Sequence, residues 1–532
     1  MSEFTNTDTE LFLEKILKFE DKNINVEHIS LPITDAKFGI LNLKAACSTP
    51  TQEELDFIFM VDCSGSMSDK CSDGRSKMQH IVHTLKNMIL YFKENSSIKA
   101  YITVDAFDNK IYKIVERCSV TSENYESIVT KVDKIYPRES TNIELALREV
   151  KTNISKIKDT NPSHTVVSIF MTDGEATAGS VKYSYLSELV DTSAKNIFIG
   201  FGVDHDALLL KAVSNGENSA YYFIDKLENS GLVYGEILYG IVYKLLMDVE
   251  ITIQNGLIYD FKNNTWVQTI RVGEIASEAD KIYHISSATP HSCLAVLSGK
   301  KTFDATNVEI HIATQEAAED LTKYIYRQRT LQHLYIVGDF LKRKNLAEST
   351  SFMNFRDQIH LTPLPNDLTE EKKIIKENLL VFIQEMKQFM HDNGLNDDKI
   401  MKNLCDDIYI SYRTFGTRYG AMYNNARQTS QGTQRCYTVS HTPEETETRD
   451  LFGNSRVSGR SLPIPRLQRH NAVTYPGNDM EILIPNLNDL PPLNHVLSDY
   501  GDAPYLTPLS TQVMREISLN INNTCEEETQ EI

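Results

Sequence analysis

The chain has 532 residues, of which 73 are acidic and 54 basic, so its formal net charge is −19. This length predicts several domains rather than one hydrophobic core, and 41% hydrophobic residues is typical of globular protein. Negative charge of this size repels phosphate groups over a Debye length of about 10 Å. The composition therefore argues against nucleic-acid binding and against binding to anionic membranes.

Eight cysteines are spread along the chain without a C-x-x-C pair. That scatter is typical of free thiols and excludes a RING-type or similar zinc site. The first residues lack the pattern of a signal peptide, and no apolar run approaches the roughly 20 residues of a membrane-spanning helix. We therefore expect a cytoplasmic or similarly reducing compartment.

The first predicted elements are short strands at 26–50, which follow an N-terminal segment, 1–25. From residue 51 to 247 apolar strands alternate with amphipathic helices. Residues 57–61 are apolar on both faces, as a central parallel strand must be. This alternation predicts a Rossmann-like α/β domain, in which a mostly parallel sheet has helices on both faces.

The pattern changes to short strands of alternating apolar and polar residues at 248–313, which is typical of an antiparallel sheet with one buried face. A unit this small needs further strands for stability. We therefore expect residues 26–50 to complete it, so that the α/β domain is inserted between the two parts of a small antiparallel β unit.

Helices predominate at 314–425, which predicts an α-helical domain after the β unit. One of these helices starts with a capping-box pattern at 367–370 and stops at Asn393-Gly394. Beyond that domain the sequence loses helical spacing and gains Pro, Asn, Ser and Gln. Residues 426–532 are therefore predicted to be a largely disordered tail.

Oxygen-bearing side chains follow or flank several predicted strands of the α/β domain. Asp62, Ser64 and Ser66 come directly after the strand at 57–61, Thr141 precedes a helix, and Asp173 follows another apolar strand. Open α/β sheets bind ligands at the carboxyl ends of their strands, so we expect these side chains to meet there. Hydroxyl and carboxylate oxygens are hard donors that favour Mg²⁺, Mn²⁺ or Ca²⁺.

These motifs resemble the metal-ion-dependent adhesion site (MIDAS) of the von Willebrand factor type A (VWA) family. The resemblance covers about 55–247. It implies that Ser64, Ser66 and Thr141 contact Mg²⁺ (or Mn²⁺ or Ca²⁺), and that Asp62 and Asp173 act partly through water. It also implies that an acidic residue of a protein partner completes the coordination shell. The motifs are Asp62-x-Ser64-x-Ser66, Thr141-Asn142-Ile143 and Thr172-Asp173-Gly174.

The sequence departs from the family pattern at two places near this site. Glu139-Ser140 stands where many relatives have two glycines before the threonine, which puts the opening of the Thr141 loop in doubt. The segment 68–76 is longer than usual and is expected to overhang the site. Arg138 is a candidate for steering an acidic partner toward it, with an ordinary surface charge as the alternative.

The flanking regions resemble the intein-associated (Vwaint-like) region that accompanies VWA domains in some eukaryotic proteins, including certain plant ubiquitin ligases. The helical stretch that contains residues 326–329 is part of this resemblance. The RING cysteines of those ligases are missing, so ligase activity does not carry over.

The predicted function is divalent-cation-dependent protein–protein interaction without catalysis, because the sequence shows no Ser/His/Asp order, phosphate-binding loop or carboxylate dyad. Two alternatives remain open. One is a scaffold with a vestigial metal site, which the departure at residues 139–140 favours. The other is a subunit of a ubiquitin-ligase-like or hydrolytic assembly.

Overall fold

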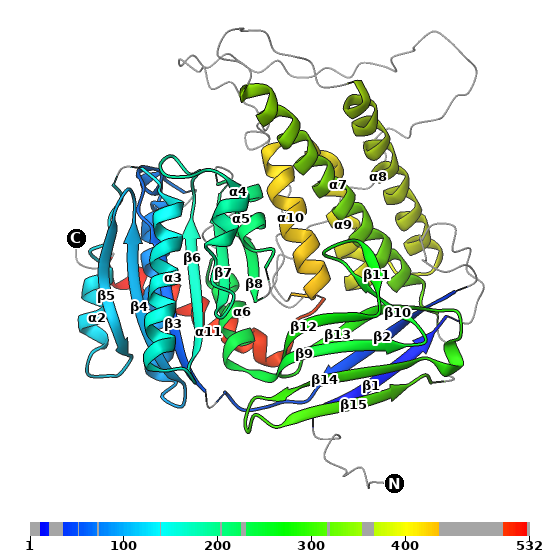
Figure 1. Ribbon diagram of the computed structural model, residues 1–532, viewed down its shortest axis with the longest axis horizontal. Coiled ribbons are helices and arrows are strands. Elements are labelled where there is room, and N and C mark those ends of the chain that lie inside the picture. The colour runs from blue at the N-terminus through cyan, green and yellow to red at the C-terminus, as the bar shows by residue number, and fades with distance from the viewer. Residues whose placement is uncertain are drawn as a thin grey trace.

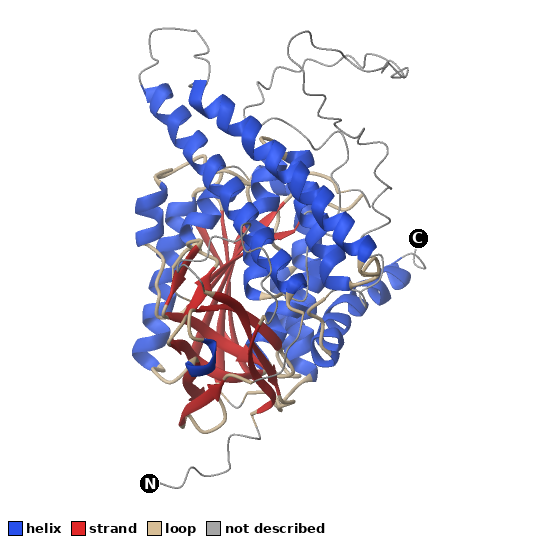
Figure 2. Cartoon of the chain, turned by 90° about the vertical axis from the view of Figure 1, so that its right-hand side faces the viewer, coloured by secondary structure: helices blue, strands red, loops and turns tan. Residues whose placement is uncertain are grey.

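A computed structural model of the chain describes residues 11–20, 36–51, 53–71, 74–138, 140–202, 205–216, 218–224, 230–315, 320–353, 366–435 and 504–528. Figure 1 shows an α/β domain on the left, a pair of antiparallel sheets at the lower right and a group of long helices at the upper right. Figure 2 shows the strands gathered in the lower part of the molecule, with helices above and on either side.

The α/β domain is built on a six-stranded sheet whose strands run in the order β5-β4-β3-β6-β7-β8. All neighbouring strands pair in parallel except β5, which is antiparallel to β4. The predicted mostly parallel sheet is therefore confirmed. The strands are β3 (Glu54–Asp62), β4 (Lys99–Phe107), β5 (Ile111–Ser119), β6 (Thr165–Thr172), β7 (Lys195–Phe201) and β8 (Ser219–Ile224).

Helices cover both faces of this sheet, as the sequence predicts, and each face has its own core. Phe57, Phe59 and Val61 of β3 pack toward one face, whereas Ile58 and Met60 pack toward the other. A strand buried on both sides is apolar throughout for this reason. The helices are α1 (Lys77–Glu94), α2 (Tyr125–Val132), α3 (Ile143–Thr160), α4 (Tyr183–Glu188), α5 (Ala207–Val213) and α6 (Ser230–Val242).

Two antiparallel sheets enclose a third core. They contain strands that precede the α/β domain in the sequence and strands that follow it. One sheet has the order β1-β2-β13-β10-β11 and the other β12-β9-β14-β15. The α/β domain is thus inserted into this β unit. The strands are β1 (Phe12–Phe19), β2 (Lys37–Ala45), β9 (Lys244–Gln254), β10 (Leu257–Asp260), β11 (Thr265–Val267), β12 (Thr269–Ala276), β13 (Asp280–Ser287), β14 (Leu294–Lys301) and β15 (Asn307–Ala313).

The β unit begins earlier in the chain than the sequence analysis expects. Strand β1 lies within residues 1–25, which the sequence pattern assigns to a separate N-terminal segment, and it pairs antiparallel with β2. Residues 26–35 of the expected strand region fall outside the described residues.

The helical region comprises α7 (Thr322–Met353), α8 (Asn366–Asp392), α9 (Lys399–Thr414) and α10 (Arg418–Thr433). Its own core joins all four of these helices, and residues of α9 and α10 also pack on one face of the α/β domain. Among the described helices, none is both long enough and apolar enough to cross a membrane.

The expected disorder at 426–532 is wrong at both ends of that segment. Helix α10 continues to Thr433, and helix α11 (Pro508–Glu528) packs against α1 and α6 of the α/β domain. In Figure 1, α11 (red) lies beside α6. Val513, Met514 and Ile517 of α11 are buried in the same core as Phe57, and this burial offsets the entropy of ordering the helix. Residues 436–503 lie outside the described part of the chain.

Candidate metal centre

The predicted metal ligands lie at the carboxyl edge of the central sheet. Strand β3 ends at Asp62 and is followed by a short 3-10 turn at Gly65–Ser68. Strand β6 ends at Thr172, directly before Asp173, and Thr141 precedes the first turn of α3. Because β3 and β6 are parallel neighbours, their following loops leave the sheet on the same edge.

Asp62 is fully buried and holds the first loop in place. Its Oδ1 accepts a hydrogen bond from the backbone N–H of Ser64 at 2.8 Å, and its Oδ2 accepts one from the Thr172 hydroxyl at 2.5 Å. Burial raises the pKa of Asp62 to about 6, and the nearby Asp173 carboxylate adds to the effect. A cation beside these two carboxylates would favour their charged forms.

Ser64, Ser66 and Asp173 form a chain of polar contacts. The two serine hydroxyl oxygens are 3.1 Å apart, and the Ser66 hydroxyl donates to Oδ1 of Asp173 at 2.7 Å. Ser64 and Asp173 are buried, whereas Ser66 is half-buried. The structure therefore brings residues from two separate loops into direct contact.

Thr141 is held beside this group by contacts with the loop that follows β6. Its backbone N–H donates to the Thr177 hydroxyl at 2.8 Å, and its carbonyl accepts from the N–H groups of Thr177 and Ala178. A Cβ atom added at Gly174 would lie 3.4 Å from the Thr141 hydroxyl oxygen and 3.7 Å from that of Ser66. Both hydroxyls thus border the space that Gly174 leaves open.

The chemistry of these donors fits a small divalent cation. The hydroxyl and carboxylate oxygens lie beside Gly174, which has no side chain. Water or a partner's oxygen would have room there to supply the remaining ligands of Mg²⁺. Within the described ranges, no group of three or more His, Cys, Asp or Glu side chains is placed to hold a metal.

Lys77 lies at this edge of the sheet, and the sequence analysis missed it. Its ammonium donates to Oδ2 of Asp173 at 2.7 Å, although the two residues are far apart in sequence. It also lies 3.6 Å from Oδ2 of Asp69, in the segment expected to overhang the site. A lysine at the start of a helix carries no sequence signal of such a contact.

Arg138 also lies among these loops. Its backbone N–H donates to the carbonyl of Cys63 at 2.6 Å, and its guanidinium carbon lies 3.8 Å from the ring centre of Tyr112 and 4.0 Å from that of Tyr136. Stacking between two rings holds an arginine in place while leaving its edge polar. The neighbouring Glu139 falls outside the described residues, so the departure at 139–140 stays untested.

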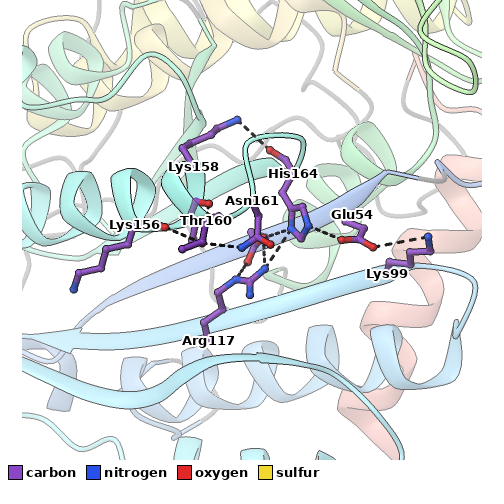
Figure 3. Close-up of polar contacts among 10 residues, drawn as sticks. Glu54, Lys99, Arg117, Lys156, Lys158, Thr160, Asn161 and His164 are labelled. Carbon is purple, nitrogen blue, oxygen red and sulfur yellow. Dashed lines mark hydrogen bonds and ion pairs between the residues drawn. The ribbon is translucent and has the colours of Figure 1, made fainter.

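A second polar cluster lies at the opposite end of the sheet, where β3 begins. Figure 3 shows Glu54, Arg117 and His164 pointing toward one another. The buried His164 ring contacts Oδ2 of Asp56 at 2.6 Å through Nδ1 and Oε2 of Glu54 at 2.5 Å through Nε2. Arg117 donates to both oxygens of Asp56. These contacts link β3, β5 and the loop before β6, and no residue of the predicted site takes part.

Part of this chain matches the model of a known protein family. A family model described as von Willebrand factor type A domain matches residues 56–234. A search of curated protein sequences found no match.

Several solved structures are similar. A von Willebrand factor type A protein from Catenulispora acidiphila shares 14% identity, covering 65% of this chain and 84% of its own, with a TM-score of 0.43. The ArnB paralog VWA2 from Sulfolobus acidocaldarius shares 13% identity, covering 79% and 97%, with a TM-score of 0.45. Proximal thread matrix protein 1 from the mussel byssus, with a zinc-occupied MIDAS motif, shares 19% identity, covering 35% and 46%, with a TM-score of 0.28.

Proposed function

Because residues 56–234 form a von Willebrand factor type A domain, we propose that the chain binds a protein partner through a divalent cation at the carboxyl edge of its sheet. The family often mediates interactions of this kind. The observation that carries the proposal is the meeting of the Ser64, Ser66 and Thr141 hydroxyls and the Asp173 carboxylate beside the open position at Gly174.

In this proposal Ser64, Ser66 and Thr141 contact the cation, and Asp62 and Asp173 act through water or through the hydroxyls that they hold. Mg²⁺ is the expected ion, with Mn²⁺ or Ca²⁺ as substitutes, because the donors are all oxygen. The cation supplies positive charge that one carboxylate of the partner can bind directly.

The partner is proposed to be a protein that presents an acidic residue, because a carboxylate completes the shell and Arg138 adds a second positive group nearby. Exposed apolar side chains flank the same loops, since Tyr136 is 56% and Val181 64% exposed. Nucleic acid and anionic membranes remain disfavoured by the net charge of −19.

We place the activity in binding rather than catalysis. Both oxygens of Asp62 accept hydrogen bonds from Ser64 and Thr172, and both oxygens of Asp173 accept from Ser66 and Lys77. These contacts support a structural role for the two carboxylates, in which they hold the loops of the site in place.

We also propose a cytoplasmic or similarly reducing compartment. Cys47, Cys63, Cys118, Cys293 and Cys405, in the described part of the chain, are free thiols. Thiols persist where glutathione or thioredoxin keeps them reduced.

The first test is the melting temperature of the full chain with and without millimolar Mg²⁺ or Mn²⁺. Binding to the native state alone stabilises it, by about 2.7 kcal/mol at a concentration 100 times the Kd, so we expect a higher melting temperature. The Ser64→Ala/Ser66→Ala variant should lose this shift. Ser68→Ala is the matched control, because the Ser68 hydroxyl donates to the carbonyl of Gly65 instead.

The second test concerns the partner. Proteins captured by the wild-type chain in Mg²⁺ should be released by EDTA and should not bind to Ser64→Ala/Ser66→Ala. Asp173→Ala is a poor choice here, since it would remove the nearest carboxylate from the buried Lys77 ammonium. A partner held equally well in chelator, or by the double variant, would place the interaction on another surface.

A further inference from the structure

Lys77 places a positive charge inside the candidate metal centre. It is the first residue of α1, and its side chain is 11% exposed where it meets the fully buried Asp173. The ammonium lies 2.7 Å from Oδ2 of Asp173, whose Oδ1 accepts from Ser66. One carboxylate therefore serves both a lysine ammonium and a hydroxyl that would hold the cation.

This position is unfavourable for a lysine in an ordinary helix. The N-terminus of a helix carries partial positive charge and favours acidic side chains, and the first turn of α1 contains none. The start of α1 is already secured by a capping box between Ser76 and Gln79. Lys77 is thus not needed to start the helix, and its buried charge is compensated by the carboxylates of the site.

We propose that the Lys77 ammonium acts as an internal counter-cation of the metal site. It weakens the affinity of the site for divalent cations and thereby sets the cation concentration at which the site fills. The inference rests on the proposed function of the same site. The ammonium neutralises part of the charge of Asp173. It also repels a divalent cation, because two positive charges repel strongly in a partly buried environment. A cation bound by Ser64 and Ser66 would have to share Asp173 with Lys77.

The Asp69 carboxylate offers the Lys77 ammonium a second ion-pair partner. Its Oδ2 lies 3.6 Å from Nζ of Lys77, and its side chain is 62% exposed. The backbone N–H of Lys77 also donates to the carbonyl of Asp69, so the two residues stay together. When a cation arrives, Lys77 can turn toward Asp69 without becoming an unpaired buried charge, which would be costly.

The test is a Mn²⁺ titration of the full chain, followed by the electron paramagnetic resonance signal of free Mn²⁺. Lys77→Met removes the charge but keeps an aliphatic side chain, and we expect it to bind Mn²⁺ about tenfold more tightly. Lys77→Arg keeps the charge and should bind within about twofold of wild type. Lys86→Gln is the matched control, because Lys86 lies on the same helix but pairs with Asp133 at the surface.

A melting experiment in chelator separates this role from a merely structural one. Lys77→Met leaves the buried Asp173 without its ammonium, so the variant should melt lower than wild type in EDTA and recover on adding Mn²⁺. Lys77→Gln repeats the measurement if the methionine variant does not fold. A folded, charge-free variant with wild-type Mn²⁺ affinity would overturn the inference while leaving the proposed function intact.

The remaining outcomes also distinguish the two ideas. If wild type and Lys77→Met both fail to bind Mn²⁺, the proposed function and the inference fall together. If only Lys77→Met binds, Lys77 competes with the metal more strongly than proposed, and the inference stands in that form.

Discussion

Gly174 borders two hydroxyl groups of the candidate metal centre. A methyl group there would lie 3.4 Å from the Thr141 hydroxyl and 3.7 Å from that of Ser66, which are ordinary contact distances. Gly174→Ala should therefore fold normally yet cover two of the proposed cation ligands, and we expect its Mn²⁺ affinity to fall about tenfold or more. Wild-type Mn²⁺ affinity in the same titration would show that the cation sits elsewhere.

Asp406, in α9 of the helical region, should make the stability of the fold depend on pH. Burial, and then the neighbouring Asp407 carboxylate, raise the pKa of Asp406 from 3.8 to about 7. The folded state then holds a proton that the unfolded chain releases near pH 4, so the stability from this group falls as pH rises from about 4 through 7.

Asp406→Asn should remove that loss, so its stability advantage over wild type should be larger at pH 8 than at pH 5. Urea unfolding followed by circular dichroism at the two pH values measures the difference. Asp397→Asn, whose carboxyl is fully exposed, should show no such trend. An equal effect of Asp406→Asn at both pH values would contradict the raised pKa.

At this scale the sequence predicted that the candidate ligands lie together, but not what surrounds them. Asp62, Ser64, Ser66 and Asp173 meet because motifs at the ends of parallel strands must share an edge. Lys77 was missed because its contact with Asp173 depends on where α1 begins relative to β6. Nothing in the residues next to a lysine encodes such a distance.

Among the elements, strands buried on both faces were the most predictable and edge elements the least. The apolar run at 57–61 marks β3 because both of its faces are covered. Strand β1 lies at a sheet edge and carries Glu14, Lys15 and Lys18. Charged side chains on an edge strand discourage pairing with other chains, and they also hide the alternation that identifies a strand.

The contacts of His164 should stabilise the end of the sheet where β3 begins (Figure 3). His164→Ala removes the ring that bridges Asp56 and Glu54, and leaves Asp56 paired with Arg117. We expect a loss of about 2 kcal/mol in urea unfolding, because buried hydrogen bonds to charged groups are lost.

Lys99→Ala is the contrasting variant for this cluster. Its ammonium lies 3.9 Å from Glu54 and is 56% exposed, so the loss should stay below about 0.5 kcal/mol. Equal effects of the two substitutions would mean that the His164 contacts add nothing beyond surface charge.

For the whole molecule, α11 packs on α6 and completes one hydrophobic core of the α/β domain. The two helices approach so closely at Gly235 that a Cβ there would lie 2.5 Å from Cα of Met514. Gly235→Ala should push α11 away, lower the melting temperature and speed amide exchange in α6.

Gly240, on the same helix, has no atom within 4 Å of an added Cβ. Gly240→Ala should therefore keep α11 in place and raise stability by about 0.5–1 kcal/mol, the usual gain for alanine over glycine in a helix. Identical behaviour of the two variants would show that α11 does not hold α6 in solution.

The place of α11 also sets an order of events during synthesis. Val513, Met514 and Ile517 complete a core whose other members have all been translated by residue 242. At about 5–20 residues per second, the roughly 270 intervening residues take about 15 to 55 s to make. Throughout that time the apolar sides of α1 and α6 lack their cover on the nascent chain. Newly made molecules should therefore depend on chaperones until the ribosome has released α11.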